Sequence, residues 1–233
     1  MFYEFGILIF SLGIILLGAE IFTNGIELLG SKLGLNEGAV GSVLAAVGTA
    51  LPETMIPVIA ILYGTNGLGK EIGVGAILGA PFMLATLAFF MAGLAGFYYR
   101  RMRPFFPKFN VDPIIIERDL SFFIVLYTTA LLAAFINVQQ IKTAIAVFLV
   151  TTYFIYVVIT VKSGTPMAMD GKIKSCFFHP KSSNPPLIKI LLQVFIALGL
   201  IVLGAKLFVN EIEKISLLFG IPGFVLALII APA

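Results

Sequence analysis

One apolar segment, residues 38–61, is interrupted by residues that a membrane helix usually excludes. Small residues fill its first half, and Pro52, Glu53 and Pro57 then follow close together. A proline has no backbone N–H, so it leaves the carbonyl four residues earlier without its helical hydrogen bond. A carboxylate at the depth of the lipid tails is costly and usually belongs to a functional site. The segment therefore predicts a helix that offers oxygen atoms inside a membrane.

Composition places the chain in the membrane. Hydrophobic residues make up 60% of it, charged residues only 12%, and its mean hydropathy is +1.08. Its apolar runs exceed the roughly 20 residues that a spanning helix needs. We therefore expect an all-α, multi-pass protein of the cell membrane, with the lipid bilayer as its surroundings and no sign of nucleic-acid binding. Six full spans and the start of a seventh are predicted, near 5–29, 36–61, 72–98, 120–136, 141–161, 187–209 and 221–233.

Cations are distributed unevenly between the predicted loops. Eleven of the 15 Lys and Arg residues lie in or beside the loops after spans one, three and five. Such loops are normally cytoplasmic, which predicts an N-terminus outside the cell. Residues 163–186, rich in Pro, Gly and Ser, form the predicted cytoplasmic linker. Its Cys176 is expected to be an ordinary loop residue that forms no internal disulfide, and its His179 to be solvated.

An internal repeat relates two of the spans. Residues 12–27 match residues 198–213 at a constant offset of 186, with identities that include a glycine pair, an asparagine and a glutamate. Five predicted spans separate the copies, and because five is odd, the second copy enters the membrane from the opposite face. This pattern is typical of inverted-repeat transporters. It predicts a first five-helix repeat at 1–162, the linker at 163–186, and the incomplete start of a second repeat at 187–233.

The repeated positions also suggest how these two spans pack. Asn24 and its equivalent Asn210 are expected to cap or bridge helices. Four repeated glycines are expected to allow close helix packing: Gly13, Gly18, Gly199 and Gly204.

The interrupted segment has the chemistry of a cation site. Thr49 and Glu53 are four residues apart and so lie on one helix face, and Pro52 frees the carbonyl of Gly48. Na⁺ and Ca²⁺ are hard cations that bind oxygen atoms, and Ca²⁺ usually takes about 6 to 8 of them. One helix cannot supply that many ligands.

The motifs resemble those of a known family. GTALPE at 48–53, preceded by LGAE at 17–20 and followed by GAILGAPF at 75–82, is similar to the first α-repeat of the sodium/calcium exchanger superfamily. The resemblance implies ten spans arranged as five plus five. It also implies that Glu53 binds transported Ca²⁺ and competing Na⁺, together with Thr49 and the carbonyl of Ala46, without a resident cofactor.

Two positions depart from the family pattern. Ala50 stands where the family has serine, so it offers only a carbonyl. Pro81 stands where the family has a ligand asparagine, but it frees the carbonyl of Ile77, which we expect to be available to the site. Both changes remove side-chain oxygens. They leave open a proton-coupled exchanger of the same fold, because a single carboxylate at that depth can carry a proton.

The leading hypothesis is a secondary active cation antiporter, with Na⁺/Ca²⁺ exchange by alternating access at a midplane site. At the repeat offset, the counterpart of GTALPE would begin directly after Ala233, so the sequence is expected to be a fragment. A non-transporting half-protein or membrane scaffold is the alternative if 233 residues is the true length. An enzyme is not expected, because no second acid, Ser–Lys or His/Asp set lies at comparable depth to Glu53.

Overall fold

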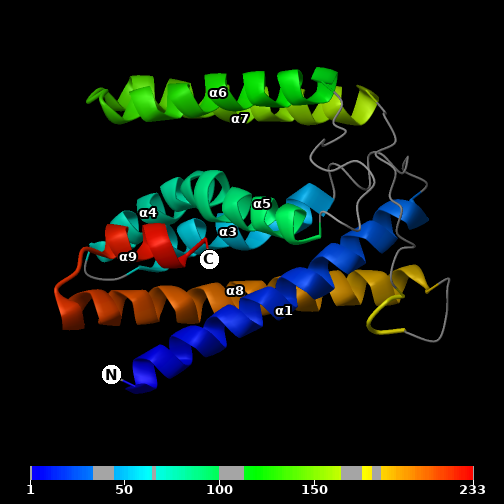
Figure 1. Cartoon of the computed structure of the whole chain (residues 1–233), viewed down its shortest axis with the longest axis horizontal. Coiled ribbons are helices and arrows are strands. Elements are labelled where there is room, and N and C mark those ends of the chain that lie inside the picture. The colour runs from blue at the N-terminus through cyan, green and yellow to red at the C-terminus, as the bar shows by residue number, and fades with distance from the viewer. Residues whose placement is uncertain are drawn as a thin grey trace. The chain divides into compact units, whose positions relative to one another are not determined.

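The computed structural model describes residues 2–33, 45–64, 67–99, 113–163, 175–179 and 185–232 (Figure 1). The regular secondary structure within these ranges is helical. Its elements, with η2 a π-helical turn, are α1 (Phe2–Lys32), α3 (Ala45–Tyr63), α4 (Leu68–Met83), η2 (Leu84–Ala88), α5 (Phe89–Tyr98), α6 (Pro113–Ala134), α7 (Gln139–Ser163), α8 (Leu187–Phe219) and α9 (Gly223–Ile230).

These helices confirm the all-α membrane class. Four of them are long and apolar enough to cross a membrane: Tyr3–Lys32, Leu68–Tyr98, Gln139–Thr160 and Leu187–Phe219. The number of membrane crossings and the orientation remain predictions. The cations at 100–112 and most of those in the predicted linker lie outside the described residues.

The helix α8 is longer than the span predicted at 187–209. It continues to Phe219 and ends at Gly220, which adopts a left-handed conformation with φ 64°. Glycine is favoured there because it has no Cβ to oppose a positive φ. The extension carries Glu211 and Glu213, which are buried although the hydropathy pattern placed them beyond the membrane segment.

The chain divides into two compact units, 1–93 with 166–233, and 94–165. In the second unit, α6 and α7 pack against each other. The rings of Phe122 and Tyr156 lie 5.2 Å apart between their centroids. Arg118 forms a 2.9 Å ion pair with Asp119 and lies over the Tyr156 ring. The two contacts of Tyr156 join the helices near the start of α6.

In the first unit, α1 and α8 cross closely (Figure 1), and these are the two helices that carry the internal repeat. A Cβ on Gly18 would lie 2.8 Å from Cγ1 of Ile201, and a Cβ on Gly204 would lie 2.7 Å from Cγ1 of Ile15. The two contacts exchange under the repeat offset, since Gly18 corresponds to Gly204 and Ile15 to Ile201. Reciprocal contacts of this kind arise from a two-fold relation between two helices. The inverted repeat of five helices and its bounds remain predictions.

The other repeated residues give a mixed result. A Cβ on Gly13 or on Gly199 would meet no atom of the described residues within 4 Å, so the prediction of close packing is wrong for this pair. The prediction that Asn24 bridges helices is confirmed, because its Oδ1 accepts a hydrogen bond from Gln193 of α8. Asn210 is exposed. Sequence identity between the copies therefore does not imply identical surroundings.

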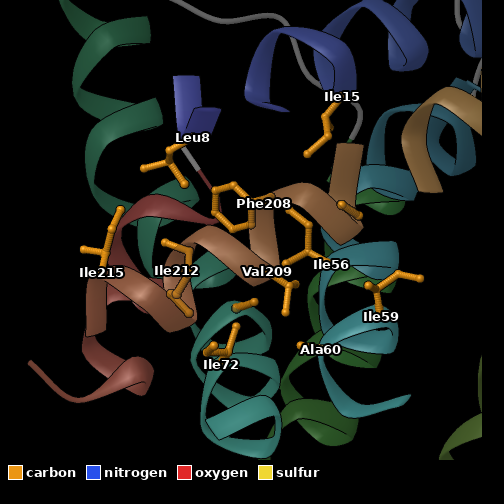
Figure 2. Close-up of a cluster of buried hydrophobic side chains, with 13 residues drawn as sticks. Leu8, Ile15, Ile56, Ile59, Ala60, Ile72, Phe208, Val209, Ile212 and Ile215 are labelled. Atoms are coloured by element: carbon orange, nitrogen blue, oxygen red, sulfur yellow. The ribbon is translucent and has the colours of Figure 1, made fainter. Parts of the chain in front are cut away.

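A hydrophobic core fills the space between α1, α3, α4 and α8 (Figure 2). Phe208, at the centre of α8, is fully buried. Around it lie buried side chains that each helix contributes at helical spacing, among them Leu8, Ile15, Ile56, Ile59, Ala60, Ile72, Val209 and Ile212. This core holds the second half of α3 against α8.

Two glycines let α4 contact the backbone of α9. A Cβ on Gly75 would meet the carbonyl oxygen of Phe224, and one on Gly79 would meet that of Leu228. The pair has the G-x-x-x-G spacing that brings membrane helices into close contact. The contact runs along most of α9 and holds it beside the helix that contains Pro81 (Figure 1).

Candidate cation site

The helix α3 directs one face toward the interior of the first unit. Glu53, Pro57 and Ala60 follow one another on this face at helical spacing. Pro57 and Ala60 are buried, and Glu53 is half-buried one turn earlier. The opposite face is exposed and apolar, with Val58 and Leu62 on it. The carboxylate therefore lies on the inward face of the helix, away from the apolar outer surface.

The carboxylate of Glu53 has an unusual hydrogen-bonding state. Its Oε2 atom is buried and has no hydrogen-bond partner in the part of the chain that the structure describes. A buried polar atom without a partner is costly, and most such atoms in proteins are bonded. Oε2 of Glu53 is thus available to a bound cation; Oε2 of Glu211 is in the same state, but that carboxylate is paired with Lys214 through Oε1.

The residues just before Glu53 include the start of the GTALPE motif. Ala46 and Thr49 belong to α3, but their side chains lie outside the described residues, so their roles as ligands remain predictions. Gly48 is buried against α1, where a Cβ would lie 2.8 Å from the hydroxyl oxygen of Thr23. The motif therefore begins where α3 contacts α1.

Ala50 is placed differently from Glu53. It is exposed, and its carbonyl oxygen accepts a 2.8 Å hydrogen bond from the hydroxyl of Thr54. A carbonyl that already accepts this bond has less capacity to bind a cation. The role of Ala50 as a ligand remains a prediction, and this geometry weakens it.

Ile77 lies at the depth of Glu53. A Cβ on Gly73 of α4 would be 3.3 Å from the carbonyl oxygen of Pro57. The helices α3 and α4 are antiparallel neighbours. Ile77, one turn after Gly73, is therefore level with Glu53, one turn before Pro57. Pro81 frees the carbonyl of Ile77 at this level. The π-helical turn η2 begins three residues after Pro81, and such turns often occur at functional sites.

The described residues contain no group of three or more His, Cys, Asp or Glu side chains that could hold a metal ion.

Two linker residues differ from expectation. Cys176 is fully buried, and its thiol lies 3.1 Å from Oε1 of Gln193. The prediction of an ordinary loop residue is wrong, because the short segment 175–179 packs onto α8. His179 is only partly exposed, with its Nδ1 2.9 Å from Nζ of Lys189.

Gln193, which is fully buried near the start of α8, was not among the residues predicted from the sequence. The available signal was its polarity within an apolar span, the criterion that had singled out Glu53.

Comparison with known proteins identifies the family. A family model described as sodium/calcium exchanger protein matches residues 3–162, more than half of the chain. The chain belongs to this family. Members of the exchanger family are transporters, which is consistent with the expectation that this chain is not an enzyme.

Two curated relatives and one solved structure are similar to this exchanger-family chain. The uncharacterized membrane protein MJ0091 of Methanocaldococcus jannaschii is 25% identical over 93% of the chain and 63% of its own length. The sodium/calcium exchanger MaX1 of Methanosarcina acetivorans is 29% identical over 52% of the chain and 33% of its own length. The chain thus spans less than two thirds of either curated relative.

The solved structure is that of the sodium-calcium exchanger NCX_Mj soaked with zero Na⁺ and Ca²⁺. It matches 98% of the chain and 70% of its own length, with a TM-score of 0.50 and 21% identity. This likeness shows the cation exchanger fold.

Proposed function

We propose that this chain contributes half of the cation site of a secondary active antiporter that exchanges Na⁺ for Ca²⁺ by alternating access. The observation that carries the proposal is the buried, unbonded Oε2 of Glu53 on the inward face of a helix containing two prolines. Membership of the exchanger family supports it. Thr49 and the carbonyls of Ala46 and Ile77 are the proposed further ligands, and the N-terminus is proposed to lie outside.

A specific observation favours proton coupling as a second candidate. The Ala50 carbonyl is already hydrogen-bonded to Thr54, and Pro81 offers no side-chain oxygen. A site with so few oxygens suits Ca²⁺ poorly, since this ion usually takes about 6 to 8 ligands. A proton on Glu53 would then replace Na⁺ as the counter-ion.

The test is Ca²⁺ uptake into Na⁺-loaded vesicles that contain the complete protein. Glu53→Gln should lower the uptake rate by about 30-fold or more, because removing one charged partner of a buried pair typically costs about 2 kcal/mol or more. The matched control is Glu71→Gln, an exposed residue at the start of α4. It should transport like the wild type.

The possible results separate the hypotheses. Uptake driven by a pH gradient without Na⁺ would establish the proton-coupled variant. Unchanged uptake with Glu53→Gln would refute the site. A complete protein that shows no flux under either gradient would favour the non-transporting scaffold.

A further inference from the structure

The helix α3 contains two prolines and runs through both of them without a break. A proline lacks the N–H that would donate to the carbonyl four residues earlier. Pro52 therefore leaves the carbonyl of Gly48 without its helical partner, and Pro57 leaves the carbonyl of Glu53 without one. The structure places these two freed oxygens on different faces of α3.

The rotation of the helix separates the two oxygens. A helical carbonyl points toward the residue four positions later, so each freed oxygen lies between its own residue and the proline. Five residues of helix place Gly48 about 140° around the axis from Glu53. Gly48 is buried against Thr23 of α1. The carbonyl of Gly48 therefore lies on the face toward α1, and the carbonyl of Glu53 lies on the inward face that carries the carboxylate.

The surroundings of the Glu53 carbonyl are buried and apolar. Pro57, Ile56 and Ala60, the residues around this oxygen on α3, are all buried, and the last two belong to the hydrophobic core (Figure 2). A backbone carbonyl in such surroundings is costly unless it has a partner. Because Pro57 removes the partner that the helix normally supplies, this position favours a partner from outside the backbone of α3.

The neighbouring helix α4 comes close to this oxygen with its backbone. A Cβ on Gly73 would lie 3.3 Å from the carbonyl oxygen of Pro57. Gly73 has no side chain to fill the space between the helices there, and Ile77, whose carbonyl Pro81 frees, lies one turn further along α4. Backbone oxygens of both helices are thus available near the carboxylate of Glu53.

We propose that the backbone carbonyl of Glu53 is a further ligand of the transported cation, and that Pro57 is the residue that makes it available. Glu53 then offers two oxygens to the ion, its buried Oε2 and its carbonyl. Backbone carbonyls are ordinary ligands of Ca²⁺. This one adds an oxygen to a site that lacks side-chain oxygens at Ala50 and Pro81. The proposal rests on the proposed function, since it places the ligand in the site at Glu53.

The experiment restores the missing N–H. In Pro57→Ala, the N–H of residue 57 donates to the carbonyl of Glu53 and so occupies this oxygen, while the carboxylate stays in place. Ca²⁺ uptake by the complete protein in vesicles should show a KM for Ca²⁺ raised about tenfold, because a polar contact to a charged partner is lost. The maximal rate should stay within about twofold, as expected when binding alone is weakened.

Stability should respond in the opposite direction. Alanine is far better than proline in a helix interior, and the restored bond satisfies a buried carbonyl. The Tm of the cation-free protein in detergent should therefore be kept or raised, whereas loss of a merely structural proline would lower it. Ca²⁺ raises the Tm only as far as it occupies its site, so Pro57→Ala should need about tenfold more Ca²⁺ for the same rise.

A matched control separates the N–H from the proline ring. Lactic acid at position 57, introduced by nonsense suppression, has the side chain of alanine but an ester oxygen in place of the N–H. It cannot donate to the carbonyl of Glu53, so it should keep the KM of the wild type within about twofold. Pro57→Val restores the same N–H with a side chain closer in volume to proline, and it serves if Pro57→Ala fails to fold.

A second control is Pro113→Ala, at an exposed proline where α6 begins, which should transport like the wild type. The ligand is overturned if Pro57→Ala keeps both the KM of the wild type and its Ca²⁺-dependent rise in Tm. It is also overturned if lactic acid at position 57 raises the KM as much as alanine does, because the ring is then responsible. Unchanged uptake with Glu53→Gln, or absence of uptake by the wild type, is instead a failure of the proposed function.

Discussion

The glycine contacts at the crossing of α1 and α8 predict a sharp difference between neighbouring glycines. Replacing Gly18 with alanine places a Cβ 2.8 Å from Cγ1 of Ile201, and 3.2 Å from the backbone oxygen of Ala197 and the nitrogen of Ile201. Two of these atoms are backbone, and the third is on a β-branched side chain with little rotamer freedom. The helices must therefore separate to accept the methyl group.

The magnitude follows from a matched comparison with Gly13→Ala, where a Cβ meets nothing within 4 Å. Both substitutions gain the same preference of alanine for helix, about 0.5–1 kcal/mol, so this contribution cancels in the difference. What remains is the overpacking cost, about 1–3 kcal/mol, which corresponds to roughly 2–12 °C in Tm for a chain of this size.

The assay is thermal unfolding of the purified protein in detergent, in which size-exclusion chromatography of heated samples measures the folded fraction. Gly204→Ala and its control Gly199→Ala should reproduce the difference, because the two crossings are reciprocal. Ile201→Ala removes the closest side-chain atom, and in that background Gly18→Ala should lose about 1 kcal/mol or more of its cost. Equal Tm values for Gly18→Ala and Gly13→Ala would refute the packing argument.

Two further substitutions test other contacts by the same assay. Gly79→Ala places a Cβ against the backbone oxygen of Leu228, so it should lower the free energy of unfolding by about 3 kcal/mol or more. Its control is Gly93→Ala, which has open space around it and should not lower it. Equal stability of the two variants would contradict the close approach of α4 and α9. Lys214→Met removes the 2.6 Å ion-pair partner of buried Glu211 and should lower the free energy of unfolding by about 1–3 kcal/mol. A Tm no lower than that of the exposed control Lys70→Met would show that this pair contributes nothing.

The polar and proline pattern of 38–61 singled out Glu53, whose role as a ligand remains a prediction. A carboxylate in an apolar run is rare because it is costly, and that cost depends only on chemistry and depth. The prediction that Asn24 bridges helices succeeded for the same reason, since a polar side chain in an apolar helix must find a partner.

Predictions that depended on exact neighbours were less successful. Four repeated glycines were indistinguishable in sequence, yet only Gly18 and Gly204 lie at the crossing. Which glycine meets the other helix depends on the crossing point and on the rotation of each helix. Neither is encoded by the glycines themselves, because packing of the whole surface decides both.

Hydropathy and the residue motifs alone determined the membrane class, the helical content and the resemblance to the exchanger family. They did so because the bilayer requires every backbone group of a span to be bonded within its helix. Only the tertiary structure decided that the carbonyl of Ala50 is engaged by Thr54, and that Gln193 joins Cys176 to α1. These contacts depend on where distant segments meet, which follows from the packing of whole helices.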